Sequence, residues 1–162
     1  MNHSLPIDKL KESIKLCAVH YDRMIYAFGK IKSNFPLDSK TYKSLTYDDL
    51  SYIDQLIFRF SKLQDSMGNK LFPAILQNLG EDTTGKPFID LLIRLEELEL
   101  LDDHKEWLRL RETRNTVTHE YPFPSEEIME GLNVLYEDVK VISDIWNHLK
   151  KYAQEKFGVS LS

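Results

Sequence analysis

The chain has 162 residues, the size of one domain, and 42% of them are hydrophobic. Its 21 basic and 26 acidic residues give a net charge of −5, which argues against a protein that coats nucleic acid by bulk attraction. A small basic cleft is still compatible with that total. Only 6 glycines and 6 prolines are present, few for a many-turned β protein, so the composition favours helices.

Cys17 is the single cysteine, which excludes an intramolecular disulfide and a cysteine-based zinc site and fits a reducing compartment. Its apolar neighbours predict a small buried side chain rather than a nucleophile. The first residues lack the basic and apolar regions of a signal peptide, and no apolar run approaches the roughly 20 residues that span a bilayer. We therefore expect a cytoplasmic protein without a membrane segment.

The spacing of apolar residues predicts five helices, of which the first covers about Ile7 to Ser33. A break around Pro36 and a short linker with tyrosines follow. The second helix starts after Thr46, which can cap it, and ends at Gly80. Pro73 is expected to kink it.

Three further helices are expected in the second half of the chain. The third begins at Pro87, and the fourth begins near Asp102-Asp103 and ends by Tyr121. The fifth is long and begins at Ser125. Since no stretch alternates as a strand would, we predict an all-α antiparallel bundle of about five helices, with residues 1–162 forming a single domain.

Polar side chains that suit RNA cleavage gather where the fourth helix ends, in residues 109–122. Cleavage without a metal needs a group that takes the proton of the ribose 2′-hydroxyl, a proton donor and a fixed cation. Histidine transfers protons near neutral pH, and arginine grips phosphate with parallel N–H bonds. Arg114 therefore fits the role of cation, His119 that of proton-transfer group, and Asn115 can orient the phosphate.

The spacing of Arg114 and His119 restricts how they can meet. Positions five apart on an α-helix lie about 140° apart around its axis, so a straight helix would not place both on one face. Either the helix ends near His119 and turns the imidazole back, or a second copy of the chain completes the site. The second arrangement implies a dimer with two equivalent clefts.

The run Arg114-Asn115-x-x-x-His119 resembles the signature of the HEPN superfamily, and Tyr121 extends the resemblance to the HepT toxins. The likeness covers the chain from about Thr46 to its end. Other segments also contribute to it: Arg59-Phe60 to Asp65, Leu71-Phe72-Pro73, Glu106-Trp107, Leu110-Arg111 and Glu120-Tyr121-Pro122.

The resemblance implies a HEPN-like homodimer that acts as a metal-independent endoribonuclease toxin, without a cofactor. It implies cleavage of RNA by attack of the 2′-hydroxyl, and neutralisation by a nucleotidyltransferase antitoxin of the MNT type. It also implies that the antitoxin can transfer AMP to Tyr121. Asp54 and Arg59 on the second helix are candidates to line the same cleft, with a plain surface position as the alternative.

Other interpretations of these residues stay open. Arg111 could widen the phosphate-binding surface, but pairing of Arg109 and Arg111 with Glu106 and Glu112 along one helix is the expected arrangement. The histidines outside the motif show no metal-ligand spacing, so we expect structural roles for them. The rival function is a non-catalytic HEPN module that serves a small nucleotidyltransferase as its substrate-binding partner. A third is a structural dimerisation bundle.

Overall fold

The computed structural model describes residues 5–121, 123 and 125–161, apart from the side chains of His119 and Glu120. Within these residues every regular element is a helix and no β-strand occurs, which confirms the predicted all-α class. No helix in this part of the chain is long and apolar enough to cross a lipid bilayer.

The five predicted helices are present, and one of them is divided. The elements in chain order are α1 (Pro6–Ile31), the 3-10 turn η1 (Lys32–Asn34), α2 (Ser39–Lys43), α3 (Tyr47–Ser66), the π-helical turn η2 (Met67–Leu71), α4 (Phe72–Asn78), α5 (Phe88–Glu97), α6 (His104–Glu120) and α7 (Glu126–Phe157). The second predicted helix therefore corresponds to α3 together with η2 and α4. The short α2 lies where we expected only a linker.

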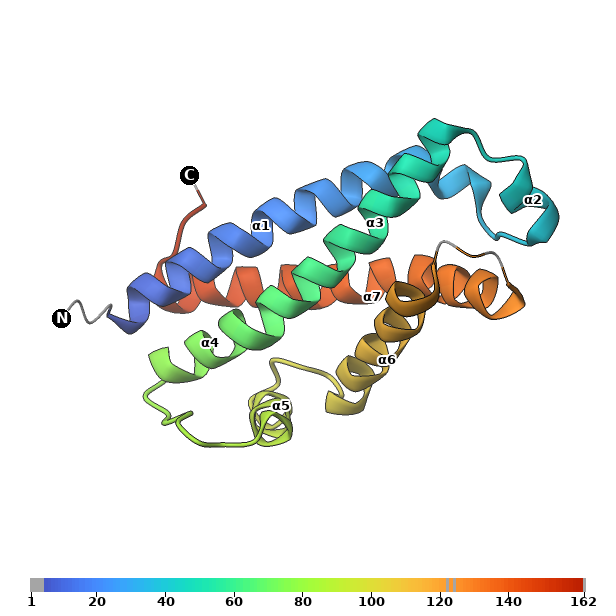
Figure 1. Ribbon diagram of the computed structural model, residues 1–162. Coiled ribbons are helices and arrows are strands. Elements are labelled where there is room, and N and C mark those ends of the chain that lie inside the picture. The colour runs from blue at the N-terminus through green and yellow to red at the C-terminus, as the bar shows by residue number, and fades with distance from the viewer. Residues whose placement is uncertain (1–4, 122, 124, 162) are drawn as a thin grey trace.

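The long helices do not all alternate in direction, because α3 and α7 both run opposite to α1 (Figure 1). In Figure 1, α1 runs in one direction while α3 and α7 return in the other. The same view shows α5 end-on and α6 inclined to α7, so neither follows the common axis. The bundle is consequently less regular than the sequence suggested. Its core is nevertheless shared by α1, α3, α4, α5, α6 and α7.

The interruption of the second predicted helix is a π-helical turn rather than a kink at Pro73. Proline has no N–H to donate, and the N–H of Phe72 just before it bonds to the carbonyl of Met67, five residues back. Gly68 lies in this turn, where an added Cβ would stand 3.3 Å from the ring of Phe88. The absence of a side chain at Gly68 therefore lets α5 approach closely.

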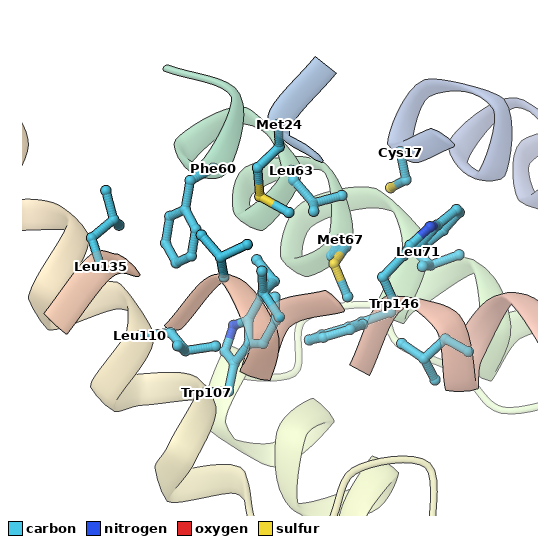
Figure 2. Packing of buried hydrophobic residues seen from close by; sticks show 14 of the residues in the cluster. Cys17, Met24, Phe60, Leu63, Met67, Leu71, Trp107, Leu110, Leu135 and Trp146 are labelled. Carbon is cyan, nitrogen blue, oxygen red and sulfur yellow. The ribbon is translucent and has the colours of Figure 1, made fainter. Parts of the chain in front are cut away.

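One face of α6 is anchored in the core. Trp107, Leu110 and Val117 are buried and recur at helical spacing, and the Trp107 ring lies 4.6 Å from that of Phe72 between centroids. Figure 2 shows Trp107 and Leu110 beside Phe60 of α3. This packing fixes the rotation of α6 about its axis, and it thereby fixes which residues of α6 face α3.

Side-chain caps fix the ends of the helices next to the motif. The Asp103 carboxylate accepts a bond from the Lys105 N–H at 2.9 Å, as the expected acidic start of the fourth helix requires. Ser125 accepts from the Ile128 N–H at 3.2 Å and starts α7 as predicted. Pro87 differs slightly from expectation, since it is the N-cap of α5 and the helix itself begins at Phe88.

Cys17 is fully buried in α1, which confirms its interpretation as a core residue. Burial raises the pKa of its thiol to about 12. The thiolate form is therefore scarce at neutral pH, and Cys17 is a poor nucleophile.

Candidate functional site

The motif identified in the sequence occupies the last two turns of α6 and its C-cap. α6 continues through position 120, and Tyr121 is the first residue with extended backbone angles, at φ −63° and ψ 139°. The helix therefore does not end before His119. Positions 114 and 119 lie about 140° apart around the axis and about 7.5 Å apart along it. The side chain of His119 lies outside the described residues, so its predicted role stays a prediction.

Arg114 is held between α6 and α3. Its Nη1 donates to Oδ1 of Asp65 in an ion pair, and its side chain keeps 25% of its surface exposed. The Nε of Arg114 is buried and has no hydrogen-bond partner in the described part of the chain. The guanidinium is thus oriented by one carboxylate, while a quarter of the side chain stays open to solvent.

Asp65 was not singled out as a site residue in the sequence, although a signal for it exists. It follows Asp54 by eleven residues, which is just over three full turns, so both carboxylates lie on the same face of α3. Two carboxylates on the same face of one helix are expected to face the same neighbouring element. Here that neighbour is the face of α6 with Arg114 and Tyr121.

Tyr121 is half-buried, and its hydroxyl is hydrogen-bonded to the Asp54 carboxylate and to the side chain of Tyr42. Burial in the first place, and the bond to Asp54 in the second, raise the pKa of the phenol well above its usual value. The phenol is therefore neutral at physiological pH. The Asp54 carboxylate lies against this phenol and can accept its proton, while its predicted place in an RNA-binding cleft stays a prediction.

Tyr42 belongs to this site and was missed by sequence reasoning. It lies on α2, a helix of five residues that is too short to produce a periodic apolar pattern. The sequence did offer one signal for this short helix, because Asp38 and Thr41 can form a capping box at its start. Both reciprocal hydrogen bonds of that capping box are formed.

Arg59 does not join Asp54, because position 59 lies about 140° further around α3. Its Nη1 lies 3.0 Å from Nδ1 of His20 on α1, so the guanidinium donates to a neutral imidazole. Burial, followed by the charge of Arg59, lowers the pKa of His20 and favours that neutral form. Arg59 thus lies on the α1 side of α3, away from Tyr121.

The expected pairing of Arg109 with its helix neighbours is wrong. Its Nη2 lies 2.9 Å from Oδ1 of Asp138 on α7, a residue that is only 2% exposed. Burial raises the pKa of this carboxyl, and Arg109 opposes that effect. A buried carboxylate competes strongly for a cation, since it has lost its water. Arg111 is exposed, with its Cζ 5.1 Å from the ring centroid of Phe88 on α5.

Asn115 is exposed on α6 and lies about 100° around the axis from Arg114. Its backbone carbonyl accepts a bond from Thr118 Oγ1 at 3.3 Å. Within one chain, Asn115 therefore does not share the Arg114–Asp65 contact. A role in orienting phosphate requires a substrate or a partner chain on this outer face.

The expectation that no histidine lies at metal-ligand spacing needs correction. Folding brings ligand atoms of Glu96, Asp103 and His104 within 4.8 Å of one another. Glu96 Oε1 accepts from the His104 N–H at 3.0 Å and lies 3.2 Å from its Nδ1, while Asp103 caps α6. These bonds account for the cluster as the start of a helix, and the cluster gives no reason to assign a metal.

Four side chains define a seam between two helices: Asp54 and Asp65 of α3 with Arg114 and Tyr121 of α6. We call it the α3–α6 seam. It holds an oriented guanidinium at one end and a phenol bonded to a carboxylate at the other. The first arrangement can bind a phosphate, and the second can lose a proton to Asp54 during attack on an electrophile.

Comparisons with known protein families, with curated proteins and with solved structures find no match to this chain.

Proposed function

We propose that this protein is a metal-independent endoribonuclease of the HEPN type, acting in the cytoplasm as the toxin of a toxin–antitoxin pair. The observation that carries the proposal is the environment of Arg114. The motif arginine is fixed at the α3–α6 seam by Asp65, with a quarter of its side chain open to solvent. A preoriented and accessible guanidinium is what a phosphate in a transition state requires.

The proposed reaction uses three side chains of the motif. His119 takes the proton of the ribose 2′-hydroxyl, and the oxygen attacks the adjacent phosphorus. Arg114 stabilises the negative charge that builds on the phosphorane oxygens, while Asn115 orients the phosphate. The bond to the 5′-oxygen then breaks, that oxygen takes a proton from water, and His119 releases its proton to water. The products are a cyclic 2′,3′-phosphate and a free 5′-hydroxyl.

A second copy of the chain completes the site in this proposal. The supporting observation is the uninterrupted course of α6 through position 120, which keeps positions 114 and 119 of one chain on different faces. In a twofold dimer, Arg114 of one protomer and His119 of its partner can converge on one phosphate. Symmetry then gives two identical clefts.

Tyr121 is the proposed control point. In this step the Tyr121 oxygen attacks the α-phosphorus of ATP held by a nucleotidyltransferase antitoxin, pyrophosphate leaves, and Asp54 accepts the phenolic proton. The hydrogen bond between Tyr121 and Asp54 supports this role for the carboxylate. The added phosphate would place a negative charge near Arg114, where it competes with RNA.

The second candidate function is a non-catalytic HEPN module that binds the substrate of a nucleotidyltransferase. The ion pair at the seam favours it, because Asp65 offsets part of the charge of Arg114. A neutralised cation holds a polyanion less strongly. The two functions differ in whether the purified protein cuts RNA.

The deciding experiment incubates the purified protein with cellular RNA in the presence of EDTA. The nuclease predicts cleavage that survives chelation and is lost in both Arg114→Ala and His119→Ala. Lys151→Ala is the matched control, since it removes an exposed cation from the far end of α7. A wild-type protein that leaves RNA intact but binds a nucleotidyltransferase tightly would support the non-catalytic module instead.

A further inference from the structure

An aromatic ring flanked by two cations is exposed on α3. Phe58 leaves 50% of its surface open to solvent. The Cζ of Arg59 lies 5.0 Å from the centroid of its ring and the Nζ of Lys62 lies 5.6 Å from it. A single exposed apolar residue is ordinary on a protein surface. Here two cations lie against the ring, and an aromatic ring beside basic side chains is the combination that single-strand nucleic-acid sites use.

A third cation from α1 adds to this cluster. Arg23 lies three residues after His20 on α1, the residue that Arg59 contacts, and its charge lowers the pKa of Arg59 after the larger effect of burial. Arg23, Arg59 and Lys62 all act in the same direction on the pKa of His20.

These three cations have no carboxylate within 4.0 Å among the residues that the structure describes. Within the described part of the chain, the Nε of Arg59 is buried and also lacks a hydrogen-bond partner. Clustered cations repel one another, and such a cluster in a chain of net charge −5 suits an anionic ligand. We call Arg23, Phe58, Arg59 and Lys62 the Phe58 strip.

The Phe58 strip adjoins the α3–α6 seam. Phe58 follows Asp54 by four residues and precedes Asp65 by seven, so all three lie on one face of α3. Arg59 extends the strip towards α1, where it contacts His20. Since packed helix axes lie about 8–10 Å apart, a path from α6 across α3 to α1 covers about 16–20 Å. Several nucleotides of an extended strand can cover that length.

We propose that the Phe58 strip binds the single-stranded segment of RNA next to the phosphate that is cut at the seam. One unpaired base stacks on the exposed ring of Phe58, and Lys62 and Arg23 bind the neighbouring phosphates. Arg59 is held beside the ring by His20. This inference rests on the proposed nuclease function for the identity of its ligand. Stacking needs a base free of a partner, so the strip selects single strands over duplexes.

Binding is measured by fluorescence anisotropy with a labelled oligouridylate of about 10 nucleotides, within the site sizes known for single-strand binders. All variants carry His119→Ala so that the probe stays intact. Phe58→Leu keeps an apolar side chain but removes the ring, and should weaken binding roughly 5- to 150-fold, the range for one stacked base. Phe58→Trp should restore it.

The contribution of the Lys62 charge to RNA binding is tested with Lys62→Ala. The control is Lys151→Ala, which removes one positive charge from an exposed residue of α7. Lys62→Ala should lower the slope of log affinity against log salt by about 0.7, as expected for one phosphate contact to a single strand. Lys151→Ala should leave it unchanged. Far-UV circular dichroism confirms that each variant is folded.

Two results would overturn the Phe58 strip. One is unchanged affinity in Phe58→Leu and Lys62→Ala. The other is competition by polyglutamate as effective as that by oligouridylate, since that polymer offers charge without bases and would indicate an acidic protein partner. If the strip variants bind as predicted while the protein with His119 intact cuts no RNA, the nuclease proposal fails and the proposed RNA-binding role of the Phe58 strip is retained. If RNA is cut but the strip variants bind normally, only the proposed RNA-binding role of the Phe58 strip fails.

Discussion

The guanidinium of Arg114 on α6 forms an ion pair with the carboxylate of Asp65 on α3, 49 residues earlier in the chain. Both side chains are partly exposed, and such pairs contribute only about 0–1 kcal/mol to folding. The value of this pair therefore lies in orientation. Asp65 sets the direction of the cation that we assign to phosphate stabilisation.

Replacing Asp65 tests this orientation directly. In Asp65→Asn the amide occupies a similar volume but no longer holds Arg114 by charge. We expect kcat for RNA cleavage to fall about tenfold while KM changes little, because a misplaced catalytic group acts mainly on the transition state. Asp144→Asn, an exposed change on α7, is the control. An unaltered kcat in Asp65→Asn would mean that the ion pair does not position Arg114.

AMP transfer to Tyr121 should depend on the Asp54 carboxylate that is hydrogen-bonded to its hydroxyl. Asp54→Asn can still accept the phenolic hydrogen bond but is a poor proton acceptor. We therefore expect AMP transfer from the nucleotidyltransferase partner to slow by about 10²–10⁴-fold, the usual effect of losing a general base. Mass spectrometry over a time course with ATP measures the rate.

Two tyrosine variants serve as controls for that time course. Tyr121→Phe should remain unmodified, and Tyr47→Phe should be modified normally although Tyr47 is 89% exposed. AMP on the Tyr121→Phe variant at the wild-type rate would place the acceptor elsewhere.

The contact between Arg109 and Asp138 predicts a clear difference between neighbouring arginines. Arg109→Ala leaves a buried carboxylate without its cation and should lower the free energy of unfolding by about 1–3 kcal/mol. Arg111→Ala removes an exposed side chain stacked on Phe88 and should cost about 1 kcal/mol or less. Urea denaturation of both variants measures the difference. Equal losses of unfolding free energy in the two variants would show that Arg109 does not stabilise the buried carboxylate of Asp138.

The lowered pKa of His20 predicts that the fold is less stable in mild acid. The unfolded chain takes up a proton near pH 6.5, whereas folded His20 resists it because of burial and Arg59. Stability from this residue is thus complete above pH 6.5 and falls as the pH drops below that value. Between pH 7.5 and 5.5 the loss should reach up to about 1.4 kcal/mol.

The His20→Gln variant provides the comparison, since glutamine can still accept a bond from Arg59 and does not titrate. Denaturant titrations at the two pH values should show a smaller acid loss in the variant than in the wild type. The same loss in both proteins would assign the pH dependence to other groups.

The long helices could be predicted from the sequence because each carries an apolar stripe at helical spacing, as Trp107, Leu110 and Val117 illustrate on α6. The division of the second helix was only partly predictable. Pro73 signalled an interruption, but the π-helical turn at Met67–Leu71 also depends on how α5 packs against Gly68.

The motif could be located from the sequence, but its surroundings could not. Arg114, Arg109 and Arg59 each contact a residue from a different helix, 49, 29 and 39 positions away. No local pattern specifies such partners, because they depend on the rotation of each helix about its axis. That rotation is set by core packing, which explains why the pairing expected for Arg109 along α6 did not form.

Complementation between two inactive variants shows whether Arg114 and His119 from two copies of the chain act on one phosphate. Arg114→Ala and His119→Ala are purified separately, then mixed and allowed to exchange subunits. Half of the dimers should be mixed, and each mixed dimer has one intact cleft out of two, so cleavage should recover to about a quarter of the wild-type rate. No recovered cleavage, with mixed dimers demonstrated by mass spectrometry, would contradict it.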